Sequence, residues 1–200
     1  DSTGDGLLIQ RWARKLGVGH PTGIDLPGET DGLVPTPEWR NEWYDEGLTD
    51  LRWSVGDNVN LSVGQGDLLT NPLQMAVAYA TVANGGTVVT PRLGLRIEDS
   101  TGRPLQELQA PASRKVTIDP SYRQSILEGL YAAANEPGGT STPVFETFPV
   151  EIAGKTGTAE TPQGDQSWYV ALAPYPNPRY VVAATIERGF GYGASATYQD

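Results

Sequence analysis

The residues best suited to chemistry lie together in one short run, Lys155-Thr-Gly-Thr158. In an extended strand, side chains alternate between the two faces of the sheet while backbone N–H and C=O groups stay in its plane. A glycine inside a strand commonly marks the close approach of another backbone or of a ligand. A lysine beside hydroxyl groups suits a carboxylate, and a strand edge can pair with an extended peptide. The run indicates a site for a carboxylate-bearing peptide, and the competing interpretation is a solvated strand end.

Several longer segments surround this run in a fixed order. They are Pro21-Thr-Gly-Ile-Asp-Leu-Pro-Gly-Glu29, Pro35-Thr-Pro-Glu-Trp39, Ser62-Val-Gly-Gln-Gly-Asp-Leu-Leu69, Thr70-Asn-Pro-Leu-Gln-Met-Ala76, Ala83-Asn-Gly-Gly86, Glu151-Ile-Ala-Gly-Lys-Thr-Gly-Thr-Ala-Glu160 and Ser167-Trp-Tyr-Val-Ala-Leu-Ala-Pro174. Lys-Thr-Gly is a motif of penicillin-binding proteins and serine β-lactamases. The ordered set resembles the C-terminal portion of the transpeptidase domain of class B penicillin-binding proteins, over about residues 6–193.

The resemblance implies a peptidoglycan D,D-transpeptidase of cell elongation or division. In such an enzyme a serine is acylated by the D-Ala-D-Ala end of a stem peptide, D-Ala leaves, and an amine of a neighbouring stem attacks the acyl-enzyme; β-lactams acylate the same serine. At the matching positions, Lys155 and Thr158 would be catalytic, Lys155 through the proton relay and Thr158 through a backbone N–H in the oxyanion hole. Thr156, Gly157 and Thr158 would bind substrate, the two threonines through its carboxylate and the glycine by leaving the strand edge clear.

The sequence departs from the family in two motifs. No serine is followed three residues later by a lysine, and there is no Ser-x-Asn triplet. We therefore expect residues 1–200 to be the C-terminal portion of a catalytic domain whose preceding segment carries the nucleophile, so that this chain alone is inactive. The polar start without Met and the end shortly after the last predicted strand favour this interpretation. The competing hypothesis is a degenerate, non-catalytic relative.

Other function classes are weighed by composition. The formal charge of −10 argues against a nucleic-acid partner, because nucleic acid is bound by a cationic face. The absence of Cys excludes a thiolate nucleophile and Cys-ligated zinc, and His20 is the one histidine, so no metal or cofactor is expected. Asp25, Glu29 and Asp31 lack the spacing of a calcium loop and are expected to serve turns. The alternatives to a transpeptidase are a β-lactam sensor or β-lactamase relative, or a non-catalytic cell-wall scaffold module.

The resemblance also implies partners and a location. The expected partners are the stem peptide, β-lactam antibiotics, the upstream segment of the same protein and other cell-wall synthesis proteins. The expected location is the extracytoplasmic face of the bacterial cell membrane, with an anchor that this chain does not contain. No apolar run approaches the length of about 20 residues that spans a bilayer.

The elements that position the Lys155 run can be predicted from periodicity and capping. The chain has 24 Gly and 16 Pro in 200 residues, which argues against a helical bundle. Apolar spacing predicts helices over residues 6–16, 71–84 and 119–135, the second capped by Thr70 or Asn71 and the third by Asp119. Strands are predicted at 87–89, 94–98, 115–118, 152–160, 168–173 and 180–187. A hairpin turn is predicted at 99–102, between the 94–98 strand and a weaker run near Leu105, together with an irregular connection at 21–37 and a loop at 136–142.

Short connections join the last three strands, so they should pair antiparallel. The predicted fold class is α+β: an antiparallel β-sheet flanked by helices, part of a penicillin-binding or serine β-lactamase-like transpeptidase fold. Ser167 and Glu160 are expected near the site rim and Trp168 in the core. Residues 64–66, Gly-Gln-Gly, are expected to form a structural turn because they lack the remainder of a phosphate-loop motif. Trp39, Trp43 and Trp53 suggest either a sugar platform or, with better support, surface packing.

Overall fold

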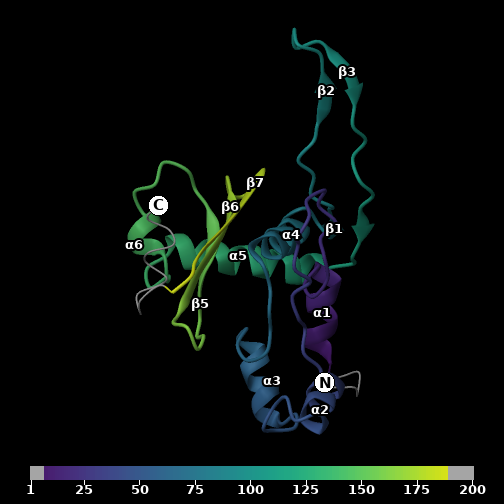
Figure 1. The fold of residues 1–200 in the computed structure, drawn as a ribbon. Helices are drawn as coiled ribbons and strands as arrows, with labels where there is room; N and C mark the ends of the chain where they lie inside the picture. The colour runs from purple at the N-terminus through teal and green to yellow at the C-terminus, as the bar shows by residue number, and fades with distance from the viewer. Residues whose placement is uncertain (1–6, 189–200) are drawn as a thin grey trace.

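The structure is a computed structural model that describes residues 7–188 (Figure 1). It contains helices and antiparallel strands, as the predicted α+β class requires, and its sheet lies beside long helices. A hairpin projects far from the body at one end, and two short helices lie at the opposite end (Figure 1). The elements are α1 (Leu8–Leu16), α2 (Pro37–Asp45), α3 (Val55–Ser62), α4 (Pro72–Ala83), β1 (Thr87–Val88), β2 (Arg96–Glu98), β3 (Pro104–Glu107), β4 (Arg114–Lys115), α5 (Pro120–Asn135), α6 (Thr142–Phe145), β5 (Ala153–Ala159), β6 (Gln166–Ala173) and β7 (Tyr180–Ile186).

The central sheet has three strands in the order β5-β6-β7, and both pairings are antiparallel. The prediction from short connections is therefore confirmed, and the bounds of the three strands differ by at most two residues from those expected. Its register places Lys155 opposite Val170 and Gly157 opposite Trp168. Because side chains alternate along a strand, Lys155 and Gly157 lie on one face and Thr156 and Thr158 on the other.

The two long helices cover the face of the sheet that carries Ala153 and its cross-strand partner Leu172. Both residues are fully buried and cluster with Leu127 of α5, and Tyr79 of α4 packs against the same cluster. On the opposite face, Tyr169 packs with Ala134 near the end of α5. The sheet is thus held from both sides at the end where β5 begins, which leaves the later residues of β5 for the site.

Capping residues begin both long helices, as predicted. Asn71 Oδ1 accepts a hydrogen bond from Gln74 N at 2.9 Å, and Gln74 Oε1 accepts one from Asn71 N at 3.3 Å, which completes a capping box on α4. Asp119 Oδ1 accepts from Ser121 N at 2.8 Å at the start of α5. Each cap satisfies a backbone N–H that has no partner within its helix.

Gln74 also fastens the irregular connection that precedes α2. Its side chain is fully buried, and Nε2 donates to the carbonyls of His20 and Asp31, both at 2.8 Å. Leu33 and Leu69 exchange backbone hydrogen bonds of 2.8 and 3.0 Å in an isolated bridge. The connection predicted over residues 21–37 is irregular in the structure but is tied to α4 and to the loop before it.

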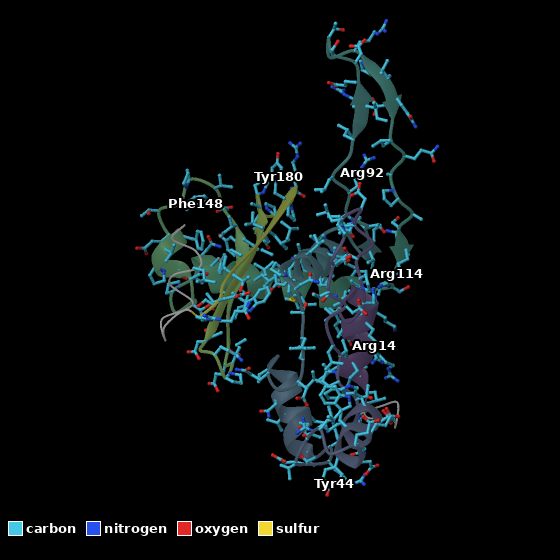
Figure 2. All side chains as sticks on the ribbon, viewed as in Figure 1. Arg14, Tyr44, Arg92, Arg114, Phe148 and Tyr180 are labelled. Atoms are coloured by element: carbon cyan, nitrogen blue, oxygen red, sulfur yellow. The ribbon has the colours of Figure 1, made fainter. Side chains whose placement is uncertain are left out.

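The projecting hairpin consists of β2 and β3, with Arg92 near its base (Figure 2). Asp99 Oδ1 accepts hydrogen bonds from the backbone of Thr101 and Arg103 in the turn, which confirms the predicted turn at 99–102. The strand predicted at 115–118 is displaced: β4 pairs with β1 at Arg114 and Lys115. Val116 N instead bonds Gly86 O at 2.7 Å, beyond the ladder.

Besides the four-residue α6, two helices, α2 and α3, were missed by the sequence analysis. Neither has a wide apolar stripe turned toward a core, since α2 buries no residue and α3 buries only Leu61. Hydrophobic periodicity therefore gives no strong signal for them. Their start signals are local instead: Thr36 and Ser54 cap them, and Pro37 begins α2. Within residues 7–188, no helix is both long and apolar enough to cross a membrane.

Candidate functional site

The Lys155 run forms one wall of a cleft of about 380 Å³. Residues 155–159 of β5 line it, and Trp168 and Val170 of β6 continue this wall. The opposite side consists of the loop at residues 63–70, and Met75 and Tyr79 of α4 also line the cleft. The cleft thus combines an exposed strand with apolar side chains, which suits a ligand that has a peptide backbone and small apolar groups.

The charged groups that line the cleft are Lys155 and, at its rim, Glu160. Lys155 Nζ donates to the Thr156 carbonyl at 3.0 Å and to Thr156 Oγ1 at 3.1 Å. Thr156 Oγ1 in turn donates to Thr140 Oγ1 at 3.0 Å. The ammonium and the two hydroxyls form one exposed chain of donors at the edge of β5. Such a group can bind a carboxylate, because charge-assisted hydrogen bonds are stronger than neutral ones.

The backbone of β5 at Thr158 faces away from β6. Its carbonyl accepts a hydrogen bond from Gln65 Nε2 at 3.5 Å, and the Thr156 carbonyl two residues earlier is bound by Lys155. In the described sheet β5 is an edge strand, so these carbonyls point to its unpaired side. A strand residue directs its N–H and C=O to the same side. The Thr158 N–H therefore faces this edge as well, where it can donate to an oxygen in the cleft.

Close packing behind the site explains why β5 contains glycine. A Cβ at Gly154 would lie 2.6 Å from the Tyr169 hydroxyl oxygen, whereas one at Gly157 would lie 3.3 Å from Trp168 Cβ. The Tyr169 hydroxyl lies 3.1 Å from Ser141 Oγ. Because Gly154 has no side chain, the Tyr169 ring can pack against it and contact Ser141 in the loop before α6. The same loop contains Thr140, which contacts Thr156.

The α4 side of the cleft is apolar in character. Burial raises the pKa of the Tyr79 hydroxyl, because the phenolate would lose its hydration there. Tyr79 consequently stays neutral over the physiological pH range and contributes a ring surface. Lys155 thus supplies a positive charge and Tyr79 an apolar ring surface to a ligand in the cleft.

The structure corrects two of the minor expectations. Trp168, expected in the core, is only partly buried and lines the cleft, since Gly157 opposite has no side chain to cover it. Ser167, expected near the rim, is fully buried. The alternation along β6 places it on the face opposite to Trp168. Glu160 does lie at the rim, as predicted.

Sequence reasoning also missed part of the site. Residues 64–66 do form a turn, in which Gly64 and Gly66 have φ of 78° and 80°. The turn lines the cleft, and Gln65 contacts β5. The one local signal was a polar residue between two glycines, which identifies a turn but not the partner of its side chain.

The other candidate residues have structural surroundings. Glu29 accepts from Thr22 N at 2.8 Å and Gly23 N at 3.2 Å. Desolvation acts to raise the pKa of Glu29, but its hydrogen bonds with Thr22 and Gly23 outweigh this effect and lower it. Asp25 Oδ1 accepts from Leu93 N at 3.2 Å. The carboxylates of Glu29 and Asp25 thus accept hydrogen bonds from backbone N–H groups of loops, which agrees with the prediction that they serve turns.

The aromatic cluster is remote from the Lys155 cleft. Trp39 and Trp43 pack on each other within α2, with ring centroids 4.5 Å apart. Neither of them lines the cleft, and nor does Trp53. This arrangement agrees with surface packing of a connecting segment. His20 is exposed, and its Nδ1 lies 3.1 Å from Pro21 O.

Comparisons with known proteins agree with the fold and the cleft. Residues 8–199 match the penicillin binding protein transpeptidase domain. Peptidoglycan D,D-transpeptidase MrdA of Salmonella typhimurium is 32% identical over 205 residues, which cover 94% of this chain and 32% of the relative. The chain therefore spans about a third of the length of that relative.

Solved structures show the same similarity. PBP2 of Pseudomonas aeruginosa, in complex with WCK 5153, has a TM-score of 0.75 and 30% identity, and the match covers 94% of this chain and 40% of that one. PBP2 of Helicobacter pylori, in complex with MreC, has a TM-score of 0.69 and 25% identity. That match covers 92% of this chain and 34% of the PBP2 chain. The family match extends over nearly all of the sequence and confirms the resemblance. This chain belongs to the penicillin binding protein transpeptidase domain family.

Proposed function

We propose that this chain supplies the substrate-binding strand of a peptidoglycan D,D-transpeptidase. The observation that supports the proposal best is the edge of β5, where Lys155, Thr156 and the Thr158 N–H converge on the 380 Å³ cleft. A stem peptide ending in D-Ala-D-Ala would lie along this edge as an added strand. Its terminal carboxylate would meet the ammonium of Lys155 and the hydroxyls of Thr156 and Thr158.

The proposed reaction uses an acyl-serine intermediate. A serine of a preceding segment attacks the carbonyl carbon of the penultimate D-Ala, and the oxygen becomes an oxyanion. The Thr158 N–H donates to this oxyanion, and a donor of this type is typically worth about 3 kcal/mol. The terminal D-Ala leaves as a protonated amine, with Lys155 supporting the proton relay. An amine of a second stem peptide then attacks the ester, which forms the cross-link and frees the serine.

The proposal extends to inhibitors, partners and location. A β-lactam would acylate the same serine, with its carboxylate at the Lys155 and Thr156 donors. The neighbour from Helicobacter pylori was solved with MreC, which supports a partner of cell-wall synthesis for this protein too. We place the protein at the extracytoplasmic face of the bacterial cell membrane, because its substrate, peptidoglycan, is assembled there.

The test is covalent labelling by a fluorescent penicillin of the parent protein, meaning the longer protein that we propose to contain this chain. We expect Lys155→Ala to reduce the acylation rate by about a hundredfold or more, because it removes charge stabilisation at the reacting group. Trp39→Ala is the control, since Trp39 lies on α2 outside the cleft. Labelling is measured by fluorescence after gel electrophoresis. Equal rates in the two variants would refute the site assignment.

Penicillin also tests the proposal that the nucleophilic serine lies in a preceding segment, whereas Lys155 and Thr158 lie in this chain. The 200-residue chain by itself should form no covalent adduct, because its Ser residues lack a lysine three positions on. Intact mass measurement after incubation with penicillin checks this. A chain carrying one added penicilloyl group would contradict the assignment of the nucleophile to a preceding segment.

A further inference from the structure

The turn at residues 64–66 is anchored to three separate parts of the molecule. Gln65 N donates to Asn60 O of α3 at 2.9 Å, which fixes the backbone at the tip. Asp67 forms an ion pair with Arg40 of α2, and the Arg40 side chain is only 17% exposed. Leu69 is held by Leu33 through two backbone hydrogen bonds. Because the loop is held at these three points, the position of the Gln65 backbone is restrained, and its side chain is directed toward the cleft.

The Gln65 side chain reaches across the cleft to β5. Nε2 donates to the Thr158 carbonyl, although the two residues are 93 positions apart in the sequence. This carbonyl belongs to the residue whose N–H faces the cleft. A peptide unit of an edge strand has no ladder partner on its open side, so a bond to its carbonyl limits its rotation. The Thr158 N–H belongs to the preceding peptide unit, which is joined to the bound one at the Thr158 Cα, so the contact restrains this N–H through the extended backbone of Thr158.

We propose that Gln65 is a positioning residue for the oxyanion donor on β5. The inference rests on the proposed transpeptidase function and names a residue of that same site. Gln65 acts through Thr158: its amide holds the carbonyl, and the strand then presents the N–H where the oxyanion forms. Preorganised donors stabilise a transition state because they need not reorient during the reaction. Loss of the amide donor should therefore slow acylation more than it weakens the first binding of substrate.

The experiment uses Gln65→Glu in the parent protein, with a fluorescent penicillin as the probe. Glutamate has nearly the same shape as glutamine, but when ionised it can only accept hydrogen bonds. It would face the Thr158 carbonyl without a donor at pH 7. We expect the acylation rate constant to fall about tenfold relative to wild type, because small misplacements at a reacting centre have large effects. The affinity of the complex that precedes acylation should change little.

Acidification gives a readout that a purely structural role would not produce. A glutamate with an ordinary pKa of about 4.3 regains a proton as the pH falls, and its carboxyl group can then donate to the Thr158 carbonyl. The rate ratio of Gln65→Glu to wild type should therefore rise severalfold between pH 7 and pH 4.5. The matched control is Gln106→Glu on the exposed hairpin strand β3, whose ratio should stay near one at both pH values.

Each outcome is decisive. A tenfold loss at pH 7 that recovers on acidification supports the role of Gln65. If the wild type is labelled and the Gln65→Glu variant has the same acylation rate constant, this inference is overturned but the proposed function stays in place. A loss that is independent of pH overturns it as well, because it indicates a structural effect of the substitution. A wild-type parent that takes up no label overturns the proposed function, and the inference with it.

Discussion

Two glycines of β5 differ in what a side chain would meet. A Cβ at Gly154 would approach the Tyr169 hydroxyl oxygen to 2.6 Å and the Val170 carbonyl oxygen to 2.9 Å. At Gly157 the nearest atom is Trp168 Cβ at 3.3 Å. Gly157 belongs to the Lys-Thr-Gly motif, but Gly154, just before it, lies in the more closely packed position. Neither residue has a positive φ, so the difference arises from space alone.

We expect Gly154→Ala to lower the free energy of unfolding by about 1–3 kcal/mol, the usual cost of overpacking a core. The added methyl group would press on Tyr169, which is buried and contacts Ser141. Gly157→Ala is the matched comparison on the same strand and should cost clearly less. Urea denaturation followed by tryptophan fluorescence measures both. Equal losses in the two variants would show that packing against Tyr169 is not the deciding contact.

At the scale of elements, α4 and α5 were predicted well and α2 and α3 were not. The long helices have both apolar periodicity and capping residues, and these signals are local. The two missed helices contact little core, so their sequences look like polar connections. Yet Arg40 of α2 and Asn60 of α3 provide two of the three anchors of the loop on which Gln65 lies. The helices with the weakest sequence signal thus shape one wall of the cleft.

The cap of α5 should make its stability depend on pH. Hydrogen bonds from the Ser121 hydroxyl and backbone lower the pKa of Asp119 below its ordinary value of 3.8. A carboxylate with a depressed pKa in the folded state stabilises the fold above its unfolded pKa, and this contribution is lost as the pH falls through the folded pKa. The loss should therefore occur below about pH 4.

Asp119→Asn tests this cap, because asparagine is an equally good N-cap but does not ionise. We expect the variant to melt near the wild-type temperature at pH 6 and to lose less stability than wild type between pH 4 and pH 2.5. Thermal unfolding followed by circular dichroism at 222 nm measures the difference. Parallel curves for the two proteins would mean that Asp119 is not linked to folding.

At the scale of the whole molecule, α3 and Val63, the residue that follows it, carry an apolar stripe that the described residues leave exposed. Val55, Val59 and Val63 follow one another at helical spacing of four and are 79%, 60% and 73% exposed. A contiguous exposed apolar surface usually marks an interaction site. In the transpeptidase proposed here, a preceding segment of the same protein would be the natural cover for such a stripe.

The exposed stripe should bind 8-anilinonaphthalene-1-sulfonate, a dye that fluoresces on apolar surfaces, in the 200-residue chain. Replacing Val55 and Val59 together by serine should lower this fluorescence without a loss of helical circular dichroism. Asn58→Ser is the control, because Asn58 is an exposed polar residue of the same helix. If the double variant and the control bind the dye equally, the stripe is not an accessible apolar surface.

The sequence by itself determined the family, the fold class, the capped helices and the strand with the Lys-Thr-Gly motif. Each of these features follows from a pattern of residues that are neighbours in the sequence, or from the order of such patterns along the chain. Only the tertiary structure decided that Trp168 lines the cleft, that Ser167 is buried, and that Gln65 reaches Thr158. The physical reason is that these features depend on the register of β5 with β6 and on contacts between segments far apart in the chain. Local periodicity carries no information about which distant carbonyl a side-chain amide will meet.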